Sequence, residues 1–319
     1  MDELTIIGAG ISGLTLIEKI RAKDKDCKLI LIDKEQYHFP NYKRISQPAD
    51  INSKIDISIW SKEVNVEFIK AKVDKINLGR KKVYFKQAEP INFSRLIIAT
   101  GLSSRKLPIK GEHREGFFYL SQINPFALKD LLKVSQEAIV YVSTFLGLGL
   151  TLSLRSLGKE VKIIAPNFDF LGSYQGKVCG FLEEKDIPFY LNSSVEEAVG
   201  EARIKAVKIS PLKVFSAQLL FVDSGFESNR NFFDEEIAGH DVFFTNFKDV
   251  YLLGDVNEKD IGNEAFFAYN QDNSQEQAKV FADYLLEGKN PVFKKRLFDL
   301  DDKSRLLSGM LQEKETTAR

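Results

Sequence analysis

The chain has 319 residues, enough for two domains of ordinary size, and its 45 lysines and arginines balance its 45 aspartates and glutamates. Without net charge no overall field attracts nucleic acid or an anionic membrane, so we expect small molecules or proteins as partners and no nucleic acid. The two cysteines are isolated and no run of about 20 apolar residues occurs, which excludes a disulfide framework, predicts no transmembrane segment and favours a cytoplasmic protein.

The first part of the chain has the pattern of a strand, a glycine-rich turn, a helix and a second strand. The apolar run Leu4–Ile7 leads into residues 8–13, GAGISG, and then into a helical pattern. A second apolar run, Leu29–Ile32, ends on Asp33. This order favours a dinucleotide-binding unit over an ordinary turn between a strand and a helix.

Each glycine of the turn has an expected role. Gly8 permits the tight turn, Gly10 lets backbone N–H groups approach a pyrophosphate, and Gly13 lets the helix pack closely on the strand. The phosphates would lie at the positive end of the helix. Asp33 is placed to accept hydrogen bonds from a ribose 2′-hydroxyl, so we expect an adenosine-containing dinucleotide.

The next segments are less specific. Residues 37–44, YHFPNYKR, are either a loop that lays Lys43 or Arg44 near a cofactor phosphate or ring, or an ordinary surface loop. His38 has no partner at metal-ligand spacing, so we predict no metal site. Val64–Ile69 and Val83–Phe85 alternate like strands and predict a small antiparallel meander inserted in the parallel fold.

Three later segments carry a resemblance to a known family. Residues 96–111, LIIATGLSSRKLPIKG, resemble the ATG segment of the FAD-dependent pyridine nucleotide-disulfide oxidoreductases that have two dinucleotide-binding domains. Residues 250–256, VYLLGDV, resemble the second FAD motif of that family, and residues 42–44 resemble its Tyr-x-Arg loop. Residues 225–229, GFESN, are similar to its Gly-x-x-Pro-Asn return to the FAD domain.

The resemblance implies an α/β fold of two Rossmann-like dinucleotide-binding domains, the second inserted in the first. The implied parts are an FAD-binding domain over 1–112 and 226–288, an NAD(P)-binding-like domain over 113–225 and a short C-terminal tail over 289–319. The implied cofactor is FAD, with Asp255 at the flavin ribitol. The residues expected to bind FAD are Gly8, Gly10, Gly13, Asp33, Arg44, Thr100, Gly101, Gly254 and Asp255.

The family's second glycine motif, for NAD(P)H, is present only in a degenerate form. A strand over residues 138–142 leads into residues 143–150, STFLGLGL. If Gly147 corresponds to the third glycine, the first two are absent, the turn is one residue shorter, and Gly149 replaces the family's glutamate. The next strand ends on Ala165, which cannot bind a ribose as an acid or an arginine would. We expect this half to keep the fold but not tight nicotinamide binding.

Two further segments leave alternatives open. The leucines at 146, 148, 150, 152 and 154 alternate with the period of a strand, whereas the resemblance predicts a helix, which we follow. A helical pattern over 263–286 closes the FAD domain. The tail after it is a helix that docks on a partner subunit or a membrane surface, or packs on its own domain. Because the family's C-terminal interface domain is missing from these residues, we expect a second copy or another subunit to cover the flavin.

The residues that are absent narrow the expected chemistry. No cysteine occurs over 37–51, where the peroxidases and coenzyme A-disulfide reductases of the family carry one, so thiol chemistry is disfavoured. The leading hypothesis is an FAD-dependent oxidoreductase that passes electrons from NAD(P)H or another donor to an iron–sulfur protein, a rubredoxin or a quinone. It would resemble NADH:rubredoxin and ferredoxin reductases or type II NADH dehydrogenases, without a named catalytic acid or base.

The second hypothesis belongs to another class of function. It is a flavoprotein subunit that has lost NAD(P)H binding and serves as an electron relay or as a structural, FAD-bearing module in a complex. A third reading is a relic of the fold that binds neither cofactor.

Overall fold

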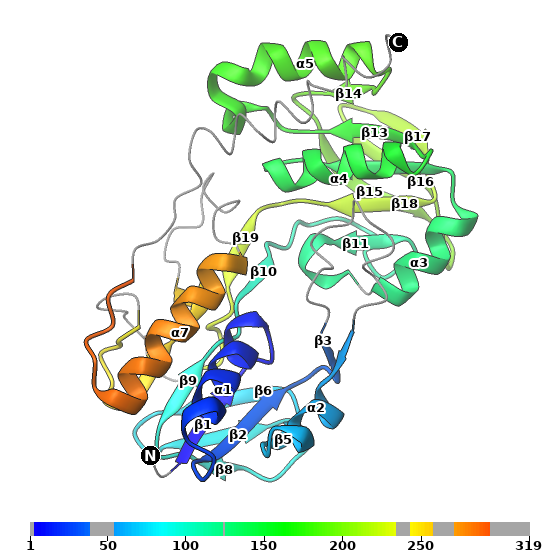
Figure 1. Ribbon diagram of the computed structural model, residues 1–319. Helices are drawn as coiled ribbons and strands as arrows, with labels where there is room; N and C mark the ends of the chain where they lie inside the picture. The colour runs from blue at the N-terminus through cyan, green and yellow to red at the C-terminus, as the bar shows by residue number, and fades with distance from the viewer. Residues whose placement is uncertain (1–2, 39–53, 124, 234–242, 258–270, 294–319) are drawn as a thin grey trace.

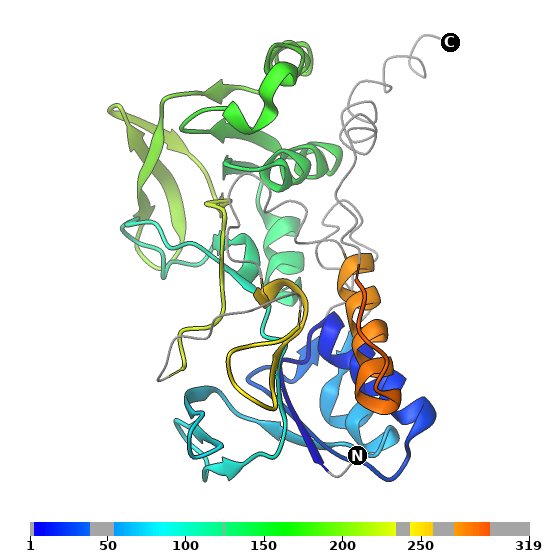
Figure 2. The same ribbon diagram turned by 90° about the vertical axis from the view of Figure 1, so that its left-hand side faces the viewer.

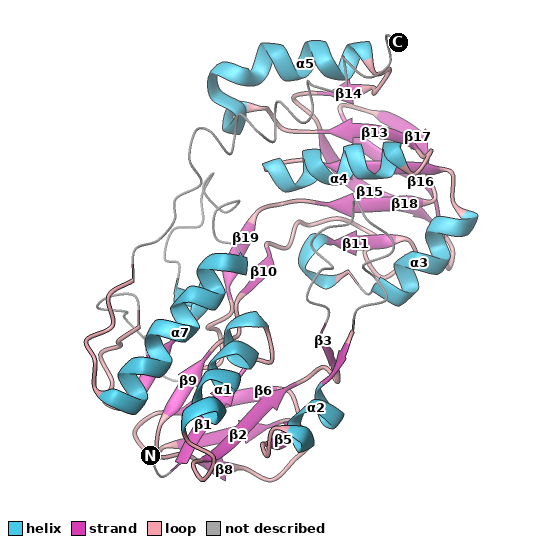
Figure 3. Cartoon of the chain, in the orientation of Figure 1, coloured by secondary structure: helices cyan, strands magenta, loops and turns pink. Residues whose placement is uncertain are grey.

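Two parallel β-sheets, each covered by helices, organise the chain (Figures 1 and 3). The computed structural model describes residues 3–38, 54–123, 125–233, 243–257 and 271–293. Strands from both ends of the described chain build the first sheet, and residues 117–222 contain the strands of the second. No helix within the described ranges is long and apolar enough to cross a membrane.

The first sheet has the strand order β20-β9-β1-β2-β5, and every neighbouring pair is parallel. Its strands are β1 (Glu3–Ile7), β2 (Lys28–Asp33), β5 (Glu67–Lys70), β9 (Leu96–Ile98) and β20 (Val250–Leu252). The central strands are apolar and buried because both faces of the sheet are covered. Helices α1 (Ile11–Lys23) and α7 (Gln271–Glu287) lie side by side on one face (Figure 1).

Helix α1 connects β1 to β2 and buries one apolar stripe. Leu14, Ile17 and Ile20 recur at a spacing of three residues, which directs them toward the sheet and α7. After α1 ends, the Asp24 carboxylate accepts the N–H groups of Asp26 and Cys27 and closes the turn into β2. The predicted strand, turn, helix and strand are therefore present.

An antiparallel sheet of three strands covers the other face of the first sheet. Its strands are β6 (Val73–Asn77), β7 (Lys82–Phe85) and β8 (Ile91–Asn92). Ile76 and Val83 are fully buried in one apolar cluster with Ile7 and Ile98 of the parallel strands, while Asp74 is exposed. This small sheet therefore packs on Ile7, the residue just before the glycine turn.

The prediction that Val64–Ile69 would be a strand of this meander is wrong. Residues 67–70 form β5, which pairs in parallel with β2 after helix α2 (Ile57–Glu63). The residues between the two predicted strands contain β6. Alternating polarity identifies a strand but not its partner, and here the crossover through α2 returns the chain parallel to β2. The short strands β3 (Tyr37–His38) and β4 (Ile55–Asp56) pair before α2.

Two antiparallel strands connect the two sheets. They are β10 (Leu102–Ser104) and β19 (Phe226–Ser228). Figure 2 shows the sheets with their helices as two separate lobes. Phe226 is buried at this connection against Leu102, Leu120 and Leu146. The domain boundaries at residues 112 and 226 stay a prediction.

The second sheet has the strand order β11-β18-β12-β13-β14, and its pairs are also parallel. Its strands are β11 (Phe117–Tyr119), β12 (Glu137–Tyr141), β13 (Glu160–Ile164), β14 (Phe189–Tyr190) and β18 (Leu219–Val222). Helices α3 (Pro125–Val134), α4 (Phe145–Ser156) and α5 (Gln175–Glu184) contribute to the larger apolar core, and the antiparallel strands β15 (Ser194–Gly200), β16 (Ile204–Ser210) and β17 (Lys213–Ser216) contribute to the smaller one.

The second sheet repeats the topology of the first. In each, a central strand is followed by a helix, a second and a third parallel strand, an antiparallel meander and the strand on the other side of the centre. The outermost strand on that side differs in chain order, because β20 comes last in the first half and β11 comes first in the second. Strand β12 therefore corresponds to β1, helix α4 to α1, and strand β18 to β9. This correspondence allows the two halves to be compared position by position.

The alternating leucines lie in helix α4, as the resemblance predicted. Leu148, Leu150 and Leu154 are buried, and Leu146 and Leu152 are partly buried. A helix packed on several faces accommodates leucines at every second position, so the strand period is misleading here.

Gly13→Ala tests the close contact between α1 and the turn. A Cβ at this position would lie 2.1 Å from the Gly8 carbonyl oxygen, so backbone must move. We expect the free energy of unfolding, measured by urea denaturation, to fall by about 1–3 kcal/mol. The control is Gly180→Ala in α5, where a Cβ meets nothing within 4 Å and helix propensity favours alanine. Equal losses of stability in both variants would contradict the prediction.

Candidate dinucleotide-binding site

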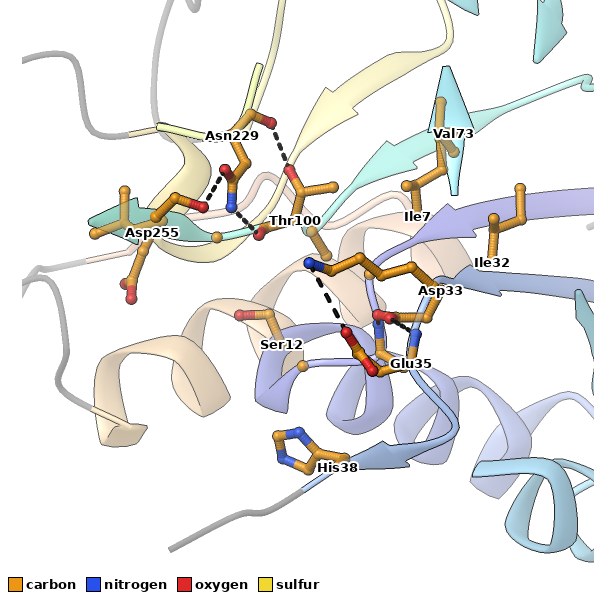
Figure 4. Close-up of a pocket in the computed structure, with 18 of the residues that line it drawn as sticks. Ile7, Ser12, Ile32, Asp33, Glu35, His38, Val73, Thr100, Asn229 and Asp255 are labelled. Carbon is orange, nitrogen blue, oxygen red and sulfur yellow. Dashed lines mark hydrogen bonds and ion pairs between the residues drawn. The ribbon is translucent and has the colours of Figure 1, made fainter. Parts of the chain in front are cut away.

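A pocket of about 460 Å³ opens at the carboxyl ends of the first sheet's strands (Figure 4). Six of the residues predicted to bind FAD line it: Gly8, Gly10, Asp33, Thr100, Gly101 and Asp255. Gly13 and Gly254 do not line it, but each packs on a residue that does, Gly13 on Gly8 and Gly254 on Ser12. Arg44, the remaining predicted residue, lies outside the described residues, as do residues 294–319 of the tail.

The path of the glycine turn requires glycine at position 8. Gly8 has a φ of +111°, and a Cβ there would lie 2.3 Å from the carbonyl oxygen of Ala99. At Gly10 a Cβ would meet nothing within 4 Å, so this side of the turn faces open space. Gly10 is the N-cap of α1 and no side chain among the described residues caps it. The helix thus presents unpaired N–H groups and its positive end to the pocket.

Asp33 lies at the end of β2, beside this turn. Its carboxylate accepts the N–H of Ala9 at 2.6 Å and the N–H of Glu35 at 2.8 Å. Burial raises the pKa of the Asp33 carboxyl, and the two backbone hydrogen bonds oppose that shift. The carboxylate is therefore held in one orientation at the edge of the pocket (Figure 4).

Asn229 is a pocket residue that the sequence analysis included only within the return segment. Its amide nitrogen donates to the Thr100 carbonyl at 3.0 Å, and the Thr100 hydroxyl donates to the Asn229 carbonyl at 2.8 Å. The Ser103 hydroxyl donates to the Asn229 side-chain oxygen at 2.7 Å. These bonds tie the segment after β9 to the segment after β19 (Figure 4). The similarity of residues 225–229 to the family's return motif was the signal for it.

The Gly254-Asp255 pair begins the short 3₁₀ helix η4 (Gly254–Asn257) across the pocket from Asp33 (Figure 4). Gly254 has a φ of +79°, and a Cβ there would lie 2.3 Å from the Ser12 hydroxyl. Its N–H donates to the buried side chain of Gln277 in α7 at 2.9 Å. Tight packing on α1 and α7 therefore sets the position of Asp255.

The corresponding turn of the second half corrects one expectation. Residues 142–144 separate β12 from α4, just as residues 8–10 separate β1 from α1, so the turn is not one residue shorter. Gly147 corresponds to Gly13, and Val142 and Thr144 stand at the positions of Gly8 and Gly10. The strand predicted from the sequence extends to residue 142, whereas β12 ends at Tyr141 and leaves Val142 in the turn.

The rest of the second half agrees with the degenerate motif. Ala165 follows β13 and is fully buried, with its N–H bonded to the Tyr190 carbonyl, so the position of Asp33 has no acid here. Gly149 has open space around its Cβ position, so packing does not explain the missing glutamate. The residues of this half do not fit a nicotinamide dinucleotide as those of the first half fit FAD.

A parallel sheet with an open glycine turn at a helix N-terminus defines a dinucleotide-binding protein. The sequence matches the family model described as pyridine nucleotide-disulphide oxidoreductase over residues 2–279. The chain therefore belongs to this family, which confirms the predicted family and the predicted α/β class with Rossmann-like units. Family membership also supports the predicted enzyme class, an oxidoreductase, and FAD as its cofactor.

Several relatives have related architectures. The chain is 23% identical over 239 residues to the ferredoxin–NAD(+) reductase component of the biphenyl dioxygenase system of Paraburkholderia xenovorans, covering 71% of this chain and 59% of that protein. It is 27% identical over 269 residues to the NADH-rubredoxin oxidoreductase of Clostridium acetobutylicum, covering 80% and 68%. The structure of an NAD-dependent persulfide reductase from A. fulgidus superposes with a TM-score of 0.74 and 20% identity, covering 92% of this chain and 60% of that chain.

The chain spans only part of many of these relatives. It covers between 45% and 59% of the length of the first curated proteins that it matches. Their complete reactions and partners therefore enter as proposals for this chain.

Asp33→Asn tests the raised pKa of Asp33 through the pH dependence of the free energy of unfolding. Since the folded-state pKa of Asp33 is raised, the folded chain holds this proton more tightly than the unfolded chain, and ionisation costs stability as pH rises through that pKa. Relative to the wild type, we expect Asp33→Asn to gain free energy of unfolding as pH rises from about 4 to about 7. Urea denaturation at both pH values measures the difference.

The matched control is Asp24→Asn. Hydrogen bonds from the N–H groups of Cys27 and Asp26 lower the pKa of Asp24, so this variant should lose relative stability as pH rises from about 2 to about 4 and change little between about 4 and about 7. If the two variants shifted in the same direction, the assignment of a raised pKa to Asp33 would be wrong.

Proposed function

We propose that the chain binds FAD in the pocket at the N-terminus of α1 and acts as a flavin-dependent electron-transfer oxidoreductase. The observation that carries the proposal is the open face of Gly10 beside the uncapped start of α1, in a member of this family. The pyrophosphate would accept hydrogen bonds from the free N–H groups there. Asp33 would accept hydrogen bonds from the adenosine ribose, since its carboxylate is already oriented by Ala9 and Glu35.

The other end of the cofactor would lie near Thr100, Gly101 and Asp255. Asp255 would bind the ribitol hydroxyls, and the Gly254 turn would hold it against α1 through the contact with Ser12. The hydrogen bonds between Thr100 and Asn229 would fix the distance between the two connecting segments. Arg44 stays a proposed phosphate or ring ligand on the strength of its sequence alone.

The bound FAD would supply the redox chemistry, because a flavin takes up two electrons and can release them singly or together. The chain's part is to bind, orient and shield it. We propose an iron–sulfur protein or a rubredoxin as the acceptor, with a quinone as the alternative. The names of a ferredoxin reductase and a rubredoxin oxidoreductase among the relatives support a protein acceptor.

Gly10→Ala separates cofactor binding from folding. Because nothing lies within 4 Å of the added methyl group, the variant should fold with wild-type stability. A Cβ facing the pyrophosphate should weaken FAD binding at least about ten-fold, which corresponds to about 1.4 kcal/mol. Isothermal titration of the apoprotein with FAD measures the affinity. Gly149→Ala, with equally open surroundings in α4, should bind FAD like the wild type. Wild-type protein that takes up no FAD would refute the proposed function.

Electron transfer to the acceptor can be tested without a nucleotide. The FAD-loaded protein, reduced anaerobically by light and an amine donor, is mixed with an oxidised ferredoxin, a rubredoxin or a soluble quinone. We expect one of the two proteins to reoxidise the flavin at least about ten-fold faster than the quinone does. Fast reoxidation by the quinone alone would move the proposal to a quinone acceptor.

A further inference from the structure

A carboxyl group of the chain itself occupies the N-terminus of α4. Asp223 follows strand β18 and is fully buried. One oxygen of its carboxyl group accepts four hydrogen bonds: from the Thr144 N–H and hydroxyl at 2.8 Å each, from the Gly147 N–H at 3.1 Å and from the Ser143 N–H at 3.3 Å. The Leu146 N–H is taken by the Thr144 hydroxyl oxygen at 3.2 Å. The donors at the start of this helix are thus directed at side chains.

These donors are the groups that a dinucleotide pyrophosphate would need. The turn and the first helical N–H groups after a central parallel strand are where phosphate binds in this fold. At the start of α1 no side chain among the described residues caps the helix, whereas the start of α4 is satisfied by Asp223 and Thr144. A phosphate could reach the second set of donors only by displacing a buried carboxyl group.

One of the corresponding positions at which the two halves differ is occupied by Ala99 in the first half and by Asp223 in the second. The N–H of Ala99 donates to the Ile7 carbonyl at the end of β1, and the N–H of Asp223 donates to the Tyr141 carbonyl at the end of β12. Both residues follow the strand that pairs with the central one, β9 and β18 respectively. In the first half the side chain at this position is the methyl group of Ala99. In the second half it is the carboxyl group of Asp223, which reaches the start of α4.

The same carboxyl group explains why residue 147 is a glycine. A Cβ at Gly147 would lie 2.6 Å from the Asp223 oxygen and 3.1 Å from the Asp223 Cβ. A Cβ at Gly13 would instead meet the Gly8 backbone. The third glycine of the degenerate motif therefore has a use in this chain that does not depend on a nucleotide.

Aromatic side chains also pack beside the start of α4. Phe145, the first residue of α4, packs edge to face on Phe170 with ring centroids 5.3 Å apart, and Phe170 contacts Phe168 at 5.9 Å. Phe168 and Phe170 belong to the segment that follows β13, and Phe168 is fully buried. This apolar packing lies between the start of α4 and the segment after β13, the two segments that an adenosine would have to contact in this fold.

We propose that Asp223 occupies the phosphate position of the second Rossmann half and closes that half to NAD(P)H. This inference rests on the proposed function, because it excludes nicotinamide nucleotides as direct donors to the same flavin. Burial raises the pKa of the Asp223 carboxyl, against the opposing hydrogen bonds from Thr144, Ser143 and Gly147. Its second oxygen has no hydrogen-bond partner among the described residues. Tyr141 and Ser143 are the other polar groups close to it.

The test uses the full chain loaded with FAD and three probes: NADH, NADPH and ADP-ribose. By isothermal titration, the wild type should bind none of them with a dissociation constant below about 1 mM. Anaerobic mixing with NADH or NADPH should leave the flavin oxidised. Asp223→Ala gives this position the side chain of Ala99 and frees the donors, so its affinity for ADP-ribose should rise at least about ten-fold.

Two variants serve as controls. Asp223→Asn keeps the size of the side chain and one acceptor oxygen, so the site should stay closed. Thr151→Ala removes a buried hydroxyl from the same helix, where it bonds only the Gly147 carbonyl, and should gain no affinity. A gain in Thr151→Ala equal to that in Asp223→Ala would overturn the assignment to Asp223. Folded Asp223→Ala protein with no gain would do the same.

A further measurement keeps the inference testable if Asp223→Ala does not fold. Hydrogen exchange of wild-type residues 142–148 should be unchanged by an excess of NADH, and protection of these amides would overturn the proposal. Flavin absorbance after FAD loading reports on the proposed function independently. Protein that loads FAD but is bleached by NADH refutes this inference alone, whereas protein that loads no FAD refutes the proposed function.

Discussion

The structure depends on how the unpaired N–H groups at the start of a helix are satisfied beside a parallel sheet. A helix leaves its first four N–H groups without internal partners, and the carboxyl ends of parallel strands bring side chains and ligands to the same place. At α1 these donors face a pocket, and at α4 they face Asp223. One physical requirement is therefore met in two ways within one chain, once by leaving room for an anionic ligand and once by an internal carboxyl group.

The repeated topology makes this difference interpretable. Both halves support their central turn with the same arrangement of strands and an antiparallel meander, so the backbone alone would assign both the same ligand. Side chains at a few corresponding positions separate them: Ala99 against Asp223, Asp33 against Ala165, and Gly10 against Thr144. A fold shared with nicotinamide-dependent enzymes does not by itself carry nicotinamide binding.

The first half was largely predictable from sequence because its signals are local. The glycines at 8, 10 and 13 and the acid at 33 lie within one strand, one helix and the next strand. The structure brings Gly8, Gly10 and Asp33 to one pocket with Thr100 and Asp255. The errors arose where partners had to be inferred. Residues 67–70 have the polarity of a strand, but only the crossover through α2 determines that they pair in parallel with β2. Asn229 was recognised as part of a motif, but its bonds to Thr100 join residues 129 positions apart.

The sequence by itself determined the family, the α/β class, the glycine turn of the first half and the degeneracy of the second. These depend on residue types at short, regular spacings, which constrain the backbone locally. Only the tertiary structure decided what occupies the start of α4, because Asp223 lies 79 residues from Thr144 and is brought there by the pairing of β18 with β12. A buried carboxyl group must find donors within hydrogen-bond reach, and which donors those are is a property of strand order rather than of local sequence.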